Sequence, residues 1–82
     1  MDERLKNIIV ALEELQSDPS VPKNVKSRIE KSIQFLKEQN NDMSLNVNKA
    51  LNELDEIAED TNMQSYTRTQ IWNIVSMLEM MC

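Results

Sequence analysis

Three donor side chains lie together near the start of the last predicted helix, where they could do chemistry. Thr67, Arg68 and Thr69 follow one another there, and the first turn of a helix presents free backbone N–H groups to an anion. Two hydroxyls and a guanidinium could complete a small phosphate or sulfate site. The alternative is structural: Ser65 or Thr67 caps the helix, and Arg68 pairs with Asp60 or lies over an aromatic ring. The pattern favours the structural interpretation, with an enzyme or anion-binding protein as a third hypothesis.

The commoner catalytic and metal-binding groups are missing from the sequence. It contains no His and no Gly, which removes the usual general acid or base, the ligands of most di-iron bundles and glycine-rich phosphate loops. The single cysteine, Cys82, has no histidine to activate it and is expected to be a frayed end. Glu14 and Glu56 form a symmetric pair. Each lies roughly 180° round its helix from the first residue of the apolar stripe, Leu5 or Val47, and should face solvent. We therefore expect no enzyme, metal, cofactor or small-molecule substrate.

Two apolar features lie away from the expected core stripe of the last helix. Measured from Ile71, Trp72 lies about 100° round the helix, and Met77, Met80 and Met81 lie at roughly 240°, 180° and 280°. A helix in a monomeric bundle needs only one apolar stripe, and Met and Trp are favoured at docking surfaces. These four residues form the candidate interface. Alternatively, Trp72 is a boundary residue wedged between helices, and the methionines are a merely apolar terminus.

Composition narrows the class of protein further. Eighty-two residues without glycine and with two prolines suit one domain of helices joined by short connections. A net charge of −5 disfavours nucleic acid or an anionic membrane as the main partner. One cysteine excludes a disulfide framework, and neither a membrane span nor a signal peptide is evident. We expect a cytoplasmic protein.

Apolar residues at helical spacing predict four helices, at about residues 2–16, 20–39, 44–59 and 63–81. Pro19 ends the first helix. Ser20 is the expected N-cap of the second, with Pro22 in its first turn. A turn is expected at residues 39–42. The second helix is basic and the third is acidic, so their facing sides should attract each other.

The two halves of the chain share one pattern at a shift of 42 residues, the separation of Asp18 and Asp60. At this shift, the apolar stripe of the first helix aligns with that of the third helix, and the stripe of the second helix aligns with that of the fourth. Neither helical hairpin can bury its stripe alone. We therefore expect an all-α fold, a four-helix bundle of two pseudo-repeated hairpins. The competing arrangement is a pair of open hairpins that closes only by pairing with a second chain.

Four motifs together resemble uncharacterised protein family 0147, a set of small, chiefly archaeal proteins. They are Asp18-Pro-Ser-Val-Pro-Lys-Asn, Leu54-Asp-Glu-Ile, Asp60-Thr-Asn-Met and Thr67-Arg-Thr-Gln-Ile-Trp. The resemblance covers essentially the whole chain. It implies an all-helical bundle in an archaeal cytoplasm, with no assigned function and no catalytic residues to carry over. The chain departs from it at Gln64, where proline matching Pro22 is expected, so the start of the last helix is less rigidly set.

Two functional hypotheses follow. The first is a non-enzymatic protein–protein interaction or assembly module, self-associating through the last helix or binding a protein partner there. The second is a nucleic-acid- or ribosome-associated accessory factor that uses the basic second helix and Arg68.

Overall fold

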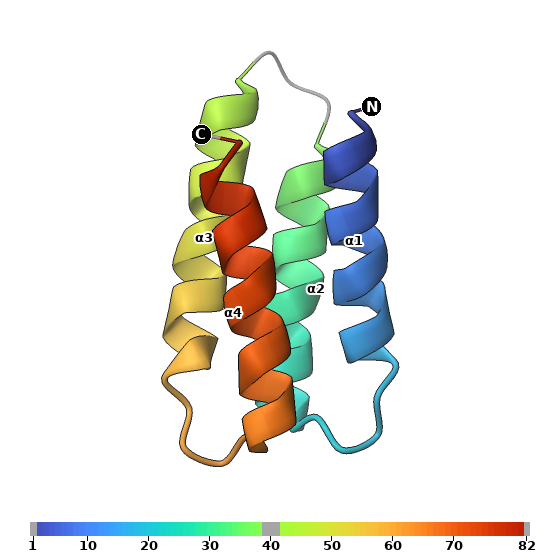
Figure 1. The fold of residues 1–82 in the computed structure, drawn as a ribbon, viewed down its shortest axis with the longest axis vertical. Helices are drawn as coiled ribbons and strands as arrows, with labels where there is room; N and C mark the ends of the chain where they lie inside the picture. The colour runs from blue at the N-terminus through green and yellow to red at the C-terminus, as the bar shows by residue number, and fades with distance from the viewer. Residues whose placement is uncertain (1, 39–41, 82) are drawn as a thin grey trace.

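The computed structural model describes residues 2–38 and 42–81. These residues form four α-helices and no strand: α1 Glu3–Gln16, α2 Lys23–Lys37, α3 Met43–Ala58 and α4 Ser65–Glu79. The helices run alternately up and down, and α1 begins at the same end of the bundle where α4 finishes (Figure 1). Each helix packs against two neighbours, because α1 contacts α4 as well as α2. The chain is therefore a closed four-helix bundle, as expected, and the open-hairpin alternative is wrong.

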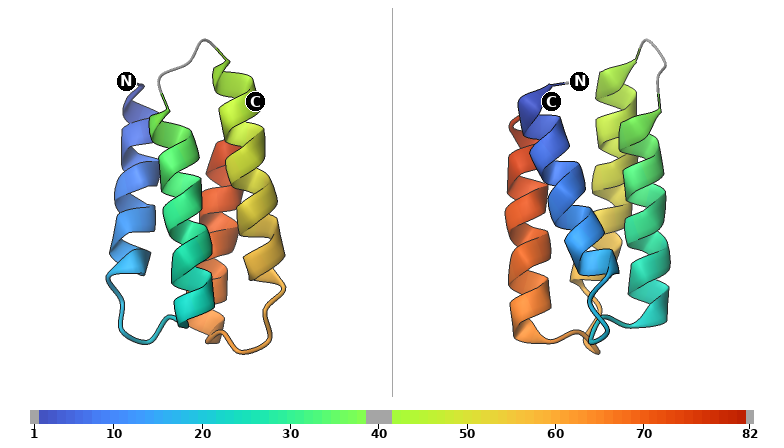
Figure 2. Two further views of the ribbon diagram at one scale, coloured as in Figure 1. Left: turned by 180° about the vertical axis from the view of Figure 1, so that it is seen from behind. Right: turned by 90° about the vertical axis from the view of Figure 1, so that its right-hand side faces the viewer.

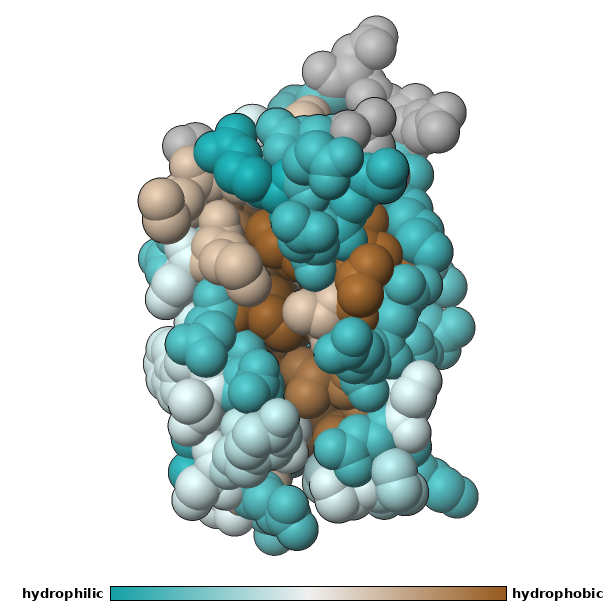
Figure 3. Space-filling view, turned by 45° about the vertical axis from the view of Figure 1, so that its right-hand side comes forward, coloured by the Kyte–Doolittle hydropathy of each residue, from teal (hydrophilic) through white to brown (hydrophobic). Residues whose placement is uncertain are grey.

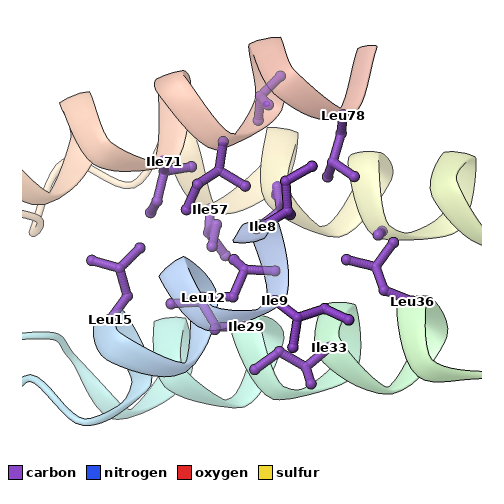
Figure 4. Packing of buried hydrophobic residues seen from close by; sticks show 14 of the residues in the cluster. Ile8, Ile9, Leu12, Leu15, Ile29, Ile33, Leu36, Ile57, Ile71 and Leu78 are labelled. Carbon is purple, nitrogen blue, oxygen red and sulfur yellow. The ribbon is translucent and has the colours of Figure 1, made fainter. Parts of the chain in front are cut away.

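One apolar core runs through the bundle, and all four helices contribute to it (Figure 4). The helices bury the stripes that their 3.6-residue period predicts. The fully buried side chains include Leu5, Ile8, Leu12, Val25, Ile29, Leu36, Val47, Leu54, Ile71, Ile74 and Leu78. Leu51 has the apolar spacing of the α3 stripe, but it is only partly buried at the margin of the core. Among the described residues no helix is both long and apolar enough to cross a membrane.

The loops that follow α1 and α3 have the same structure. In the first, the Asp18 carboxylate accepts a hydrogen bond from the Ser20 backbone N–H at 2.9 Å. In the second, the Asp60 carboxylate accepts one from the Asn62 N–H at 2.8 Å. Both loops lie at the same end of the bundle (Figure 2). They are Asx turns, in which a short carboxylate side chain bonds the backbone two residues later. The 42-residue repeat is thus present in the structure down to its turns.

The helix starts differ from the predicted ones by a few residues. Ser20 is not the N-cap of α2, because its N–H and its hydroxyl both donate to Asp18 within the turn. The N-cap is Pro22, and that of α4 is Gln64; neither makes a side-chain capping bond. Capping of α4 by Ser65 or Thr67 is therefore wrong. In the expected turn at 39–42, only Asp42 is described, and it caps α3; residues 39–41 and Cys82 lie outside the described residues.

The repeat relates α1 to α3 and α2 to α4, so the two-fold pseudo-axis runs along the bundle. The line of contact between α2 and α3, here called the α2–α3 seam, is therefore equivalent to the α1–α4 seam on the opposite side. Of the pairs of neighbouring helices, α2 and α3 pack most extensively and α1 and α4 least. The less extensive packing of α1 against α4 places the candidate site at the α1–α4 seam.

Candidate protein docking surface

Side chains that reach across the α2–α3 seam hold it closed. Arg28 Nη1 on α2 donates to the carboxylates of both Glu53 and Glu56 on α3. Nearer the other end of the seam, the Lys49 ammonium lies 5.6 Å from the centre of the Phe35 ring. Such a cation–π contact is favourable even at an exposed site. The two contacts join α2 to α3 at two heights along the bundle.

A buried amide closes the upper end of the same seam. Asn46 is fully buried, and its Nδ2 donates to the Glu38 carbonyl oxygen at 3.3 Å. The equivalent positions of the α1–α4 seam hold Arg4 and Met80, which are both exposed. The contact is therefore not repeated there.

The lower half of the α1–α4 seam lacks the cation that bridges its counterpart. Gln70 stands where α2 has Arg28, and it faces Ala11 and Glu14 instead of two glutamates. Among the described residues, no side-chain hydrogen bond or ion pair joins α1 to α4. A hollow of about 200 Å³ opens at this place, lined by Ala11, Glu14, Leu15, Asp18, Tyr66 and Gln70.

The upper half of the α1–α4 seam is open for the same reason. Asn7 and Met77 occupy the places of Lys49 and Phe35, so the cation–π contact has no counterpart. A second hollow of about 260 Å³ is lined by Arg4, Asn7, Ile8, Met77 and Met80. Figure 3 shows the result as a furrow along this side of the molecule, with strongly hydrophobic side chains visible inside it.

Charge is distributed unevenly along this furrow. Its floor is apolar and includes Ile8 and Leu15, which belong to the core. Arg4 lies at the upper end, and Glu14 and Asp18 lie at the lower end. The furrow therefore has an apolar floor and carries opposite charges at its two ends.

The outer surface of α4 carries very little charge. Arg68 and Glu79 are the only charged residues among its fifteen. Its exposed large side chains are Tyr66 at 66%, Trp72 at 49%, Met77 at 41% and Met80 at 79% exposure. Exposed aromatic and methionine side chains on one helix with little charge are typical of a docking surface.

The structure separates the four residues predicted as an interface. Met77 and Met80 line the upper hollow. Trp72 lies about 140° round the helix from Met77 and lines neither hollow. Met81 is partly buried against the core. The furrow instead brings in Tyr66 and one face of α1, which the apolar pattern of α4 did not indicate. The repeat contained a signal for this surface. Gln70 aligns with Arg28, so the α1–α4 seam lacks the cation that bridges the α2–α3 seam.

The three candidate anion donors do not converge. Thr67 is buried in the bundle and Thr69 is exposed. The guanidinium of Arg68 donates to the backbone carbonyl oxygen of Asp60 at 2.8 Å. Arg68 therefore bonds the backbone of Asp60 and not its carboxylate. Glu14 and Glu56 are both exposed, as expected, and within the described part of the chain no cluster of acidic or sulfur ligands could hold a metal.

Local hydrogen bonds shift the pKa values at these turns and at the bridged seam. The Ser20 backbone N–H and hydroxyl lower the pKa of Asp18, and the Asn62 N–H together with the Asn24 amide lowers that of Asp60. The bond to Glu53, with the charges of Glu53 and Glu56, raises the pKa of Arg28.

Comparison with known proteins gives a consistent picture. A model of the uncharacterised protein family UPF0147 matches residues 1–81. The chain is 38% identical to a UPF0147 protein of Methanocaldococcus jannaschii over 95% of its own length and 84% of the relative. It is 39% identical to one of Thermoplasma volcanium over 96% and 90%.

Two solved structures are similar over nearly the whole chain. One is a UPF0147 protein from Thermoplasma acidophilum, with a TM-score of 0.91, 35% identity and coverage of 99% of this chain and 96% of that one. The other is a protein of unknown function, with a TM-score of 0.89, 40% identity and coverage of 94% and 88%. Neither description assigns an activity.

Proposed function

The chain belongs to the uncharacterised protein family UPF0147, and we propose that it is a non-enzymatic protein–protein interaction or assembly module that self-associates through α4. The observation that carries the proposal is the furrow between α1 and α4, bordered by the nearly uncharged outer surface of α4. The furrow has an apolar floor and is flanked by exposed Tyr66 and Met80. A second protein surface that covers it removes this apolar surface from water and so lowers the free energy of the complex.

Methionine and tyrosine suit this role for physical reasons. Met80 is unbranched and adapts to irregular partner surfaces, and Tyr66 combines a large apolar ring with a polar tip. Met77 lies at the border of the upper hollow, where a partner would cover it. Trp72 lies on the α3 flank of α4, so it would contribute only to a partner broad enough to reach round the helix.

The test replaces the two methionines of the furrow by serine. Met77→Ser with Met80→Ser should weaken self-association, measured by sedimentation velocity across a concentration series. The melting temperature should stay close to that of the unchanged protein, because both side chains are substantially exposed. Met43→Ser is the matched control, since Met43 is exposed at 40% on α3, outside the residues that line the furrow.

Two results would count against the proposal. An unchanged association of the double variant would remove the furrow from the interface. A large loss of helicity would place the methionines in the core rather than at a docking surface. A Trp72→Ala variant run beside them reports whether the interface extends onto the α3 flank.

The nucleic-acid alternative has weaker support, because three of the cations that it would use already have partners within the chain. Arg28 bridges two glutamates, Lys37 Nζ lies 3.3 Å from the Glu13 carboxylate, and Arg68 bonds the Asp60 carbonyl. Binding to phosphates would weaken steeply with salt, by roughly one log unit per log unit of salt for each contacted phosphate. Affinity capture washed at low and high salt separates the two hypotheses.

A further inference from the structure

The α2–α3 seam indicates which group would complete the α1–α4 seam. At the position of Arg28, which bridges Glu53 and Glu56, the other half has Gln70. Glu14, the counterpart of Glu56, has no ion-pair partner among the described residues. A guanidinium supplied from outside the chain would therefore meet an unpaired carboxylate beside the lower hollow.

The chain itself carries a suitable guanidinium at the other end of the furrow. Arg4 lines the upper hollow, and about two-thirds of its side chain is exposed. Its partner in the chain is Asp2, at 3.3 Å, in an exposed contact of the kind that contributes about 0–1 kcal/mol. Glu3 also lies at this end, about 100° round α1 from Arg4, and is not among the residues that line the upper hollow.

We infer that two copies of the chain pack furrow to furrow and antiparallel, with Arg4 of each copy against Glu14 and Asp18 of the other. This inference rests on the proposed function and specifies its partner. The two-fold axis would cross the bundle near Ala11 on α1 and Asn73 on α4. These residues are at similar heights, because Ile8 shares the upper hollow with Met77, and Leu15 shares the lower one with Gln70.

The spacing of the side chains agrees with this axis. Arg4 lies seven residues before Ala11, about 10 Å along α1, and Asp18 lies seven residues after it, in the turn just beyond the end of α1. Tyr66 and Met80 lie equally far on either side of Asn73. An antiparallel two-fold arrangement therefore sets Arg4 against Asp18 and Tyr66 against Met80 twice each, as an isologous interface requires. A parallel arrangement would instead set α1 against α4 of the other copy and would separate Arg4 from Glu14 and Asp18.

Charge and size also favour a second copy over other occupants. Each copy has a net charge of −5, so two copies repel unless they meet where acidic groups are few or paired. The nearly uncharged α4 and the Arg4 end provide such a side. One whole side of the bundle measures 36 by 19 Å, about 700 Å² in projection, so two copies would have to cover most of this side to approach the roughly 800 Å² per partner of a standard interface.

Charge reversal in the full chain tests the arrangement. Arg4→Glu should weaken dimerisation at low salt by about tenfold or more, because two attractive contacts become repulsive. Glu14→Arg should weaken dimerisation as well, since position 14 would face Arg4 of the other copy. Mixing the two variants should restore a heterodimer, in which the two reversed charges would attract each other and the native Arg4 would meet the native Glu14. Sedimentation velocity and native mass spectrometry measure the species formed.

The matched control is Lys6→Glu, which makes the same change of charge on the same helix about 160° from Arg4. Association that falls equally in Lys6→Glu and Arg4→Glu would reflect net charge alone and overturn the inference. Association that depends on Met77 and Met80 but not on Arg4 would retain the proposed function and overturn the antiparallel arrangement. A chain that stays monomeric at high concentration would overturn both.

Discussion

Arg28 and Gln70 occupy equivalent positions in the two halves of the bundle, but only Arg28 bridges to the helix that faces it. Arg28 bonds Glu53 and Glu56 on α3, whereas Gln70 lines a hollow beside α1. This and the other differences between the repeats therefore accompany a closed seam on one side and an open one on the other. A repeat makes such differences interpretable, because each half shows what the other would need.

Gln70→Arg should close the lower half of the furrow. The new guanidinium can reach Glu14 as Arg28 reaches Glu56, although Ala11 offers no second carboxylate. As an exposed pair it should add only about 0–1 kcal/mol to the free energy of unfolding. Self-association should fall, because Glu14 is occupied and the lower hollow is filled. Thermal melts and sedimentation velocity measure the two effects.

The control for that change is Gln34→Arg, which adds the same charge at an exposed position of α2. If both variants alter association equally, the effect comes from net charge and the equivalence of Gln70 with Arg28 has no consequence.

Gln64→Pro should stabilise the fold. Gln64 has φ −67° and ψ 150°, and its counterpart Pro22 has φ −59° and ψ 151°. The position already holds the backbone that proline prefers, so proline removes freedom only from the unfolded chain. The expected gain is about 0.4–1 kcal/mol, a rise of a few degrees in melting temperature. Gln64→Ala should give no such gain; a destabilised proline variant would mean that the N–H of Gln64 is needed.

The sequence predicted the helices and the core because each helix buries one stripe with a regular period, and the repeat supported the pairing of hairpins. It did not predict the furrow, since periodicity locates a stripe on a helix but does not say which helix lies beside it. Trp72 and Met77 both lie off the core stripe, yet they point to different flanks of α4. Ser20 has a side chain suited to capping, but the carboxylate of Asp18 holds it in the turn.

Leu54→Ala should destabilise the bundle strongly. Leu54 is fully buried, and truncating such a residue costs about 2–5 kcal/mol, because the cavity left behind collapses only partly. The free energy of unfolding of a chain of this size is roughly 4–12 kcal/mol, so the variant should be near the limit of folding. Leu51→Ala, at the margin of the core, should cost clearly less. Urea denaturation followed by circular dichroism compares them, and equal losses would contradict the observed difference in burial.

Acid should destabilise the chain through its two Asx turns. Hydrogen bonds in the folded state lower the pKa of Asp18 and of Asp60 below the ordinary value of 3.8. A carboxylate with a lowered pKa stabilises the fold above its unfolded pKa and loses that contribution as the pH falls through the folded pKa. Stability should therefore be level near neutral pH and decline below about pH 4. Asp2, bonded to Arg4, contributes in the same direction.

The variant Asp18→Asn with Asp60→Asn isolates the two turns. Its side chains can still accept the backbone N–H bonds but cannot ionise, so it should be less stable at pH 7 and decline less steeply below pH 4. Asp55→Asn, at an exposed position of α3, is the control and should keep the steeper profile. Urea melts at a series of pH values give the slopes. Parallel profiles for the double variant and the unchanged protein would show that other carboxylates cause the acid sensitivity.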